Sequence, residues 1–183
     1  MNSYLNSIIK QFEYYKSLGD KTFEQLTFDE IKHPPNTYSN SISIITKHII
    51  GNMLSRWTNF LTEDGEKDWR HRDTEFDDTF TSKQELIEAW NNGWNCLFDA
   101  IKPLTENDLE RLIYIRNQGH TVTEAINRQL AHYAYHIGQI VFLGTLIKNE
   151  DWQSLSIPKG NSTNYNKEKF NKSKGRRHFT DDL

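Results

Sequence analysis

Two histidines in the C-terminal half of the chain are spaced so that they could bind one ion together. His132 and His136 lie four residues apart in a segment with helical apolar periodicity, so their rings would project from one face of one helix. On a helical wheel that starts at Ile126, the pair falls toward the edge of the apolar face. A side chain in that place can be half enclosed by the core and still be open to solvent.

A third histidine occupies a comparable position on another predicted helix. His48 follows Ile45 by three residues and precedes Asn52 by four, which places it beside an apolar stripe. If the two helices are neighbours, one imidazole from the first can converge with two from the second. Three neutral imidazoles suit Zn, Ni, Cu or Fe(II) and leave a coordination position open. An ion with an open position can lower the pKa of a bound water or bind a thiolate.

Ordinary packing is the competing interpretation of these histidines. A pair four residues apart on a helix is more often a pair of surface or packing side chains than a metal site, and the residues alone leave both interpretations open. The other four histidines lie before a proline pair, in a charged loop, at a glycine turn and in the tail, and are weaker candidates: His33, His71, His120 and His178.

Polar neighbours could support such a site. Asn52 lies one turn past His48, and Gln139 lies about one turn past His136, so either could orient a bound water or an imidazole N–H. Each could equally be an ordinary polar residue at the edge of a helix. No Asp or Glu lies within one helical turn of the pair on its own helix, so no catalytic base can be named.

Three further side chains are candidates for a substrate pocket. Arg56 and Trp57 lie about two turns past His48 and could line the same cleft, although a core position is the stronger expectation for Trp57. Arg70, like Arg72 beside it, lies in a charged loop and could bind an anionic group of a substrate.

Long helices are expected to position these residues. The chain has only 9 Gly and 4 Pro, and they cluster between periodic segments. Helices are predicted over residues 3–25, 41–61, 82–102 and 123–148, with one further turn that Thr27 and Glu30 would cap. We therefore expect an all-α, up-and-down four-helix bundle.

The connections are less regular. Residues 62–81 form a long charged loop, which is either a solvated surface or a lid over the metal. Residues 112–122 look extended, with a bend at Asn117–Gly119, and predict a small hairpin or an irregular crossover. We expect the bundle to occupy residues 1–157. Residues 158–183 would form a polar tail with seven basic and three acidic residues, disordered from about residue 171.

Composition excludes several classes of protein. The net charge of −3 gives no reason to expect nucleic-acid binding, and the single cysteine, Cys96, excludes an intrachain disulfide framework. No apolar run approaches the roughly 20 residues of a membrane span, and the N-terminus does not resemble a signal peptide. We expect a cytoplasmic, single-domain protein with neither a nucleic acid nor a membrane as partner.

Several ordered motifs resemble one family. The stretch HYAYHIGQIVFL, which begins at His132, resembles the H-x-x-x-H-x-G-Q signature of the DinB/YfiT-like superfamily of four-helix bundle proteins. Upstream, SIITKHIIGNMLSRW carries the matching single histidine. Together with NMLSRWTNFLTEDGEKDWRHRDTEF, YIRNQGHTVTEAINRQL and SIPKGNS, these motifs are similar to one uncharacterised bacterial DinB-like subfamily, over nearly the whole chain to about Asn171.

The resemblance implies a metal and a class of chemistry. Members of the superfamily hold a divalent metal with three histidines, which correspond in position to His48, His132 and His136. Nickel or zinc is the expected ion, with iron or manganese as further candidates. Some relatives transfer a low-molecular-weight thiol to electrophiles, and others are thiol-dependent isomerases or hydrolases.

The function expected from the resemblance is that of a metal-dependent enzyme acting on a small molecule. It would be a transferase in which a metal-bound thiolate attacks an electrophile, or a hydrolase. The alternatives are a non-catalytic metal-binding stress-response protein and a scaffold with an empty site. By analogy with relatives, a homodimer is expected.

Overall fold

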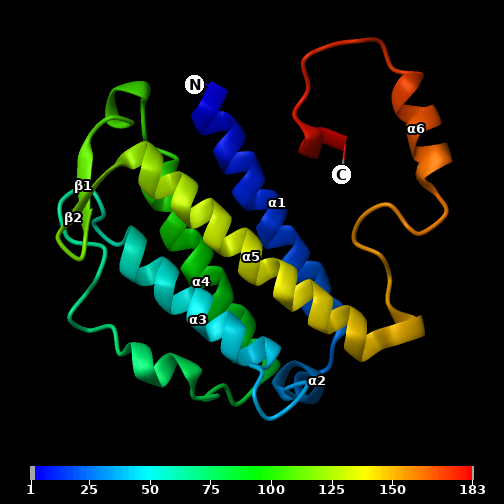
Figure 1. Cartoon of the computed structure of the whole chain (residues 1–183), viewed down its shortest axis with the longest axis horizontal. Coiled ribbons are helices and arrows are strands. Elements are labelled where there is room, and N and C mark those ends of the chain that lie inside the picture. The colour runs from blue at the N-terminus through cyan, green and yellow to red at the C-terminus, as the bar shows by residue number, and fades with distance from the viewer. Residues whose placement is uncertain (1–2, 183) are drawn as a thin grey trace.

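Four long helices that lie side by side dominate the computed structural model, which describes residues 3–182 (Figure 1). They are α1 (Ser3–Gln25), α3 (Ile42–Trp57), α4 (Lys83–Ile101) and α5 (Val122–Lys148). Helices α1 and α3 each contact both α4 and α5, so the four helices enclose a shared interior. The expectation of an all-α protein is confirmed, apart from one short hairpin.

Polar side chains at the helix starts explain where the helices begin. The hydroxyl of Ser41 accepts the N–H of Ile44 at the start of α3, and Thr121 forms a reciprocal capping box with Glu124 at the start of α5. Thr27 and Glu30 form the predicted capping box of the short helix α2 (Phe28–Lys32). Each long helix therefore starts within one residue of its predicted position.

The end of α3 was predicted too late. The helix stops at Trp57 instead of continuing to residue 61, because Thr58 has ψ 118° and Asn59 has φ 49°, neither of which an α-helix can accommodate. Phe60 is nevertheless buried, so its apolar character reflects a turn packed on the core.

Aromatic side chains fill the interior where the helices meet. Phe12 of α1, Trp94 of α4 and Tyr133 of α5 are fully buried. Their ring centroids lie 6.0–6.3 Å apart in tilted or edge-to-face arrangements, which aromatic pairs prefer. This packing fixes the rotation of α5, and with it the direction in which His132, next to Tyr133, projects.

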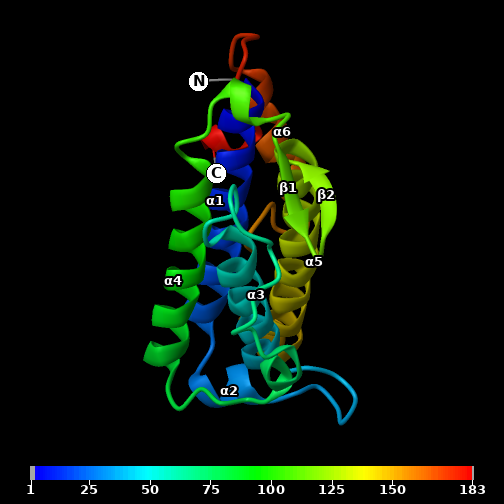
Figure 2. The same ribbon diagram turned by 90° about the vertical axis from the view of Figure 1, so that its left-hand side faces the viewer.

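The predicted hairpin is present and leads directly into α5 (Figure 2). Strands β1 (Leu112–Ile115) and β2 (Gln118–Thr121) pair antiparallel, with Ile115 opposite Gln118. The two loop residues are Arg116 and Asn117, with φ 56° and 59°, the sign required by a type I′ turn. The bend thus lies one residue earlier than expected. The carboxylate of Asp64 accepts both of their backbone N–H groups and fixes the tip.

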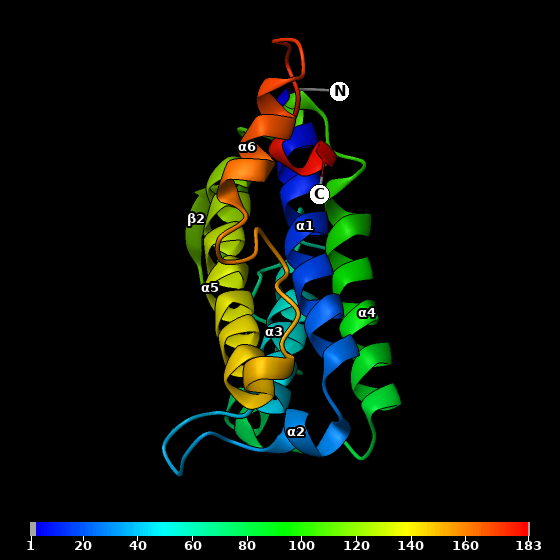
Figure 3. The same cartoon turned by 90° about the vertical axis from the view of Figure 1, so that its right-hand side faces the viewer.

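The C-terminal tail contacts α1. After helix α6 (Ser162–Phe170), the chain returns to α1 as the short 3-10 helix η4 (Phe179–Asp182) (Figure 3). Phe179 packs edge-on against Tyr14, and Lys10 pairs with Asp181.

Within residues 3–182, no helix combines the length and the apolar character needed to cross a membrane.

Candidate metal centre

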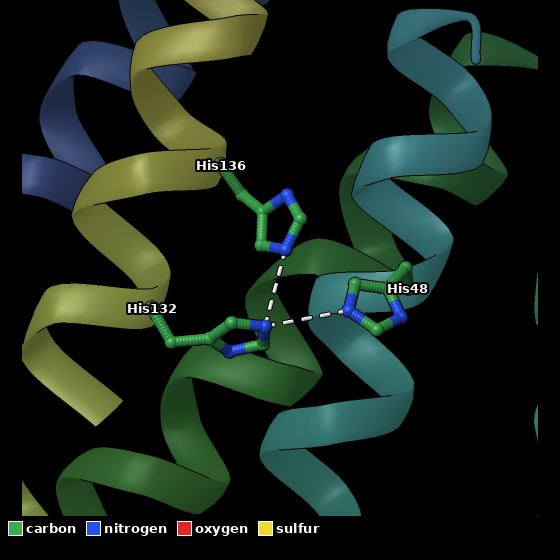
Figure 4. Close-up of side chains that lie close together, drawn as sticks. All are labelled: His48, His132 and His136. Carbon is green, nitrogen blue, oxygen red and sulfur yellow. Dashed lines mark hydrogen bonds between the residues drawn. The ribbon is translucent and has the colours of Figure 1, made fainter. Parts of the chain in front are cut away.

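Three imidazoles from two neighbouring helices point toward one another (Figure 4). His132 and His136 project from α5 and His48 from α3. The Nε2 atom of His132 lies 3.1 Å from Nε2 of His136 and 3.4 Å from Nε2 of His48. One ligand atom from each ring lies within 4.8 Å of the others, so the three histidines could hold a metal ion.

The spacing of these nitrogens fits a first-row metal. Zinc holds imidazole nitrogens at about 2.0–2.1 Å, so two nitrogens on a tetrahedral ion are roughly 3.3–3.4 Å apart. The observed separations of 3.1 and 3.4 Å lie close to that value. Two of the three pairs of nitrogens therefore already have about the separation of nitrogens that share an ion.

Two of the three rings are held from behind by oxygen acceptors. Nδ1 of His48 lies 3.0 Å from Oε2 of Glu75, and Nδ1 of His136 lies 2.8 Å from Oε1 of Gln139. Because a carboxylate or amide oxygen can only accept, each Nδ1 must carry the proton and donate it. In a neutral ring the other nitrogen then has a free lone pair. Both Nε2 lone pairs therefore face the space between the rings, as metal ligation requires.

The third ring lacks such a partner. Nδ1 of His132 is buried and makes no hydrogen bond, and Oε1 of Gln129, three residues earlier on α5, is likewise buried and unpaired. In the absence of an ion, Nε2–H of His132 can donate to a neighbouring Nε2. Ligation through Nε2 would require that proton on Nδ1, which has no hydrogen-bond partner among the described residues.

Burial keeps the pair on α5 neutral. Desolvation, aided by the charges of His136 and His48, lowers the pKa of His132 from 6.5 to about 4. Desolvation also lowers the pKa of His136, although the hydrogen bond to Gln139 opposes this. Neutral imidazole is the form that binds metals, so both rings are ready to ligate at neutral pH.

Glu75 is the residue that sequence reasoning missed. It lies in the 3-10 helix η1 (Arg72–Phe76), 27 residues from His48 along the chain, and its side chain is buried. Burial alone would raise the pKa of this carboxyl, but hydrogen bonds from His48 and Arg70 lower it, so Glu75 is ionised. The only sequence signal was an acidic residue inside a long loop, which does not specify a partner.

Arg70 binds Glu75. Its Nε and Nη2 donate to the two carboxylate oxygens of Glu75 at 2.6 and 3.0 Å, and its side chain is buried. Arg72 is more exposed and pairs with Glu66. Arg70 thus pairs with an anion of the chain itself, and its Nη1 is buried and makes no hydrogen bond.

The other polar candidates on α3 lie inside the protein. Asn52 accepts a hydrogen bond from the hydroxyl of Tyr133, and the indole N–H of Trp57 donates to the same hydroxyl. The guanidinium of Arg56 pairs with Glu66 and also donates to the carbonyl oxygen of Gly65. Among the described contacts, Gln139 is the only predicted neighbour that forms a hydrogen bond with one of the three histidines.

The charged segment that was considered as a lid is fastened along α3. Lys47 donates to the carbonyl oxygens of Thr74 and Asp77, and the hydroxyl of Ser43 donates to Asp78.

Two exposed aromatic rings flank the centre. Phe76 stacks on His48 with centroids 5.8 Å apart, and Tyr135 lies edge-on to His136 at 5.0 Å.

The remaining histidines lie apart from this centre. His33 and His71 are exposed. His178 contacts the hydroxyl of Ser7 on α1. His120 lies in β2 and has a buried Nε2 that makes no hydrogen bond.

Comparison with known families assigns the chain to one of them. A search of curated proteins gives no match. The model of a family described as "Protein of unknown function (DUF1572)" matches residues 1–161, and so covers most of the sequence, including η1 and all three histidines. The chain is therefore a member of the DUF1572 family.

Proposed function

We propose that this protein is a divalent-metal-dependent enzyme of the DinB-like superfamily, built on a four-helix bundle, which transfers a low-molecular-weight thiol to an electrophilic small molecule. The observation that carries the proposal is the convergence of three Nε2 atoms from α3 and α5. Hydrogen bonds from His48 and His136 to Glu75 and Gln139 direct two of the lone pairs inward.

The donor set suggests the ion. Three imidazoles without thiolate or carboxylate ligands suit borderline metals, so we propose nickel or zinc, with iron or manganese as further candidates. A divalent ion held there would lower the pKa of a coordinated thiol or water and supply a nucleophile at neutral pH.

Thiol transfer is favoured over hydrolysis by the surroundings of the centre. In the described part of the chain, one carboxylate forms a hydrogen bond with any of the three rings. It is that of Glu75, and it is occupied by Arg70 and by Nδ1 of His48. It is therefore not free to take a proton from water. A thiol depends less than water on such a base, because its own pKa lies much closer to neutrality.

Exposed aromatic rings give the substrate a place to pack. Phe76 and Tyr135 contact His48 and His136, yet they are 51% and 64% exposed. Aromatic side chains beside a few polar groups commonly contact small-molecule ligands. We propose that an apolar part of the electrophile packs on them.

A thiol-conjugation assay tests this function. Protein loaded with zinc or nickel would be mixed with a panel of thiols and a chromogenic electrophile such as 1-chloro-2,4-dinitrobenzene, with p-nitrophenyl acetate as a separate hydrolytic substrate. We expect loaded wild-type protein, but neither metal-free protein nor His136→Ala, to accelerate loss of the thiol. Turnover of the ester alone would favour hydrolysis.

Tight metal binding without turnover in either assay would support the alternative function, a non-catalytic metal-binding protein of the stress response. In either case we propose that the partner is a small molecule and neither a nucleic acid nor a membrane. We also propose that the protein is cytoplasmic and forms homodimers. Sedimentation of the purified protein tests the dimer.

A further inference from the structure

We propose that Glu75 is a positioning residue of the metal centre, which holds His48 in the tautomer that leaves Nε2 free for a cation. The inference rests on the proposed function insofar as it concerns metal affinity, but the tautomer of His48 can be measured without any metal.

The contacts of Glu75 allow it only to accept a hydrogen bond from His48. Oε1 accepts from Nε of Arg70 at 2.6 Å, and Oε2 accepts from Nη2 of Arg70 at 3.0 Å and from Nδ1 of His48 at 3.0 Å. Arg70 presents only donors, so both oxygens must be acceptors. His48 therefore meets an obligatory acceptor at Nδ1, which selects the Nδ1–H tautomer.

Gly51 makes room for this carboxylate. It lies three residues after His48 within α3, where glycine is otherwise unfavourable. A Cβ at this position would lie 2.5 Å from Oε1 and 3.0 Å from Cδ of Glu75. The absence of a side chain at Gly51 thus leaves the space that the carboxylate of Glu75 occupies when it contacts His48.

The segment around Glu75 is held so that this contact is maintained. Lys47, next to His48 in the sequence, donates to the backbone carbonyls of Thr74 and Asp77 on both sides of Glu75. Phe76 stacks on the ring of His48 with an interplanar angle of 18°. The ring is therefore fixed in both orientation and tautomer from the side opposite α5.

An amide cannot replace the carboxylate. In Glu75→Gln, an NH₂ group at the Oε1 position would face the Nε–H of Arg70, donor against donor. An NH₂ group at the Oε2 position would donate to Nδ1 of His48 and favour the Nε2–H tautomer, in which the metal-binding nitrogen carries a proton. The first orientation still accepts from Nδ1 of His48 but repels Arg70, which holds the side chain in place. The second also meets the Nη2–H of Arg70 and offers His48 a donor. The amide therefore no longer enforces the Nδ1–H tautomer.

The first experiment measures zinc affinity by competition with a chromophoric chelator. We expect Glu75→Gln and Gly51→Ala each to weaken zinc binding by about 10- to 100-fold, the usual cost of losing a hydrogen bond to a metal ligand. Gly51→Ala should stay folded, because alanine favours the helix and only the end of a flexible side chain must move.

Two matched controls accompany these variants. Glu63→Gln makes the same carboxylate-to-amide change in the same segment, where Glu63 pairs only with Lys67 and Asn59 among the described contacts. Gly138→Ala makes the same change in α5, where a Cβ would meet no atom within 4 Å. We expect both controls to keep the wild-type zinc affinity within about twofold, since neither substitution changes a hydrogen bond to the Nδ1 atom of a candidate ligand.

The second experiment reads the tautomer by ¹⁵N NMR of the histidine rings in metal-free protein at pH 7.5. We expect Nδ1–H at His48 in wild type and Gly138→Ala, and a shift toward Nε2–H in Glu75→Gln. A structural role alone would weaken folding without changing this ratio.

The outcomes separate the two proposals. Wild type that binds no metal but shows Nδ1–H at His48, lost in Glu75→Gln, would contradict the proposed function and keep the positioning role. Tight metal binding that is unchanged in both Glu75→Gln and Gly51→Ala would overturn the positioning role and leave the proposed function standing. Nε2–H at His48 in the wild type would also overturn it.

Discussion

The hydroxyl of Tyr133 on α5 donates a hydrogen bond of 3.0 Å to the side-chain oxygen of Asn52 on α3, inside the protein. The same hydroxyl accepts from the indole N–H of Trp57 at 3.1 Å. Burial raises the pKa of Tyr133 well above its ordinary value, so the hydroxyl keeps its proton. Since Tyr133 is the neighbour of His132 and Asn52 lies one turn from His48, this chain of bonds joins the two helices that carry the candidate ligands.

Removal of that hydroxyl should weaken the fold. Tyr133→Phe leaves the indole N–H and the amide oxygen buried without partners, which costs about 1–3 kcal/mol. Urea unfolding followed by circular dichroism measures the change in the free energy of unfolding. Tyr135→Phe, at an exposed position on the same helix, is the control and should change it by less than about 0.5 kcal/mol. Equal effects of the two substitutions would mean that the buried bonds contribute nothing.

Two glycines of α5 should respond in opposite ways to alanine. A Cβ at Gly144 would lie 2.8 Å from Cγ2 of Thr22 on α1 and 3.2 Å from the ring of Trp152, whereas a Cβ at Gly138 would meet open space. We expect Gly144→Ala to destabilise by about 1–3 kcal/mol through overpacking, and Gly138→Ala to be neutral or stabilising by up to about 1 kcal/mol. Thermal unfolding distinguishes them, and a stabilising Gly144→Ala would show that α1 and α5 are less closely packed than described.

The lowered pKa of His132 makes the stability of the metal-free protein depend on pH. The unfolded chain takes up a proton near pH 6.5, whereas the folded protein does so only near pH 4, so the unfolded state binds more protons in between. Stability therefore falls as the pH drops from about 6.5 toward 4.

Comparison with His132→Gln isolates this contribution, because other groups titrate in both proteins. On going from pH 7 to pH 5, wild type should lose on the order of 1 kcal/mol more than the variant, after allowance for the solvent that reaches this partly buried ring. Urea unfolding at the two pH values provides the measurement. A variant that loses as much as wild type would show that His132 titrates normally.

Local signals made most of the helical structure predictable. Thr27 with Glu30 and Ser41 are capping residues that act within one turn, so their effect is visible in the sequence. The end of α3 was less predictable, because Phe60 continues the apolar pattern although the backbone has already left the helix at Thr58 and Asn59. The hairpin turn was misplaced by one residue, because Arg116 takes a positive φ that is supported from outside the hairpin by Asp64.

The candidate centre was predictable only in part, because one of its contacts, like the support of the hairpin turn, joins residues that are distant in the sequence. His132, His136 and Gln139 lie on one helix, so their spacing alone suggests a cluster. Glu75 reaches His48 across 27 residues through an irregular segment, and only the space at Gly51 and the pairing with Arg70 bring it there. Tertiary contacts of this kind leave no periodic signal.

The central claim is that His48, His132 and His136 hold one divalent ion, and metal titration of protein without a histidine tag tests it most directly. Calorimetry with zinc and nickel, checked by elemental analysis after gel filtration, gives stoichiometry and affinity for wild type, for alanine variants at each of the three histidines, and for His71→Ala as an exposed control. We expect about one ion per chain in wild type and in His71→Ala, and affinity weakened by more than about 100-fold in each of the other variants, because two imidazoles alone bind weakly. Full metal content in His48→Ala or His136→Ala, or no binding by the wild type, would contradict the claim.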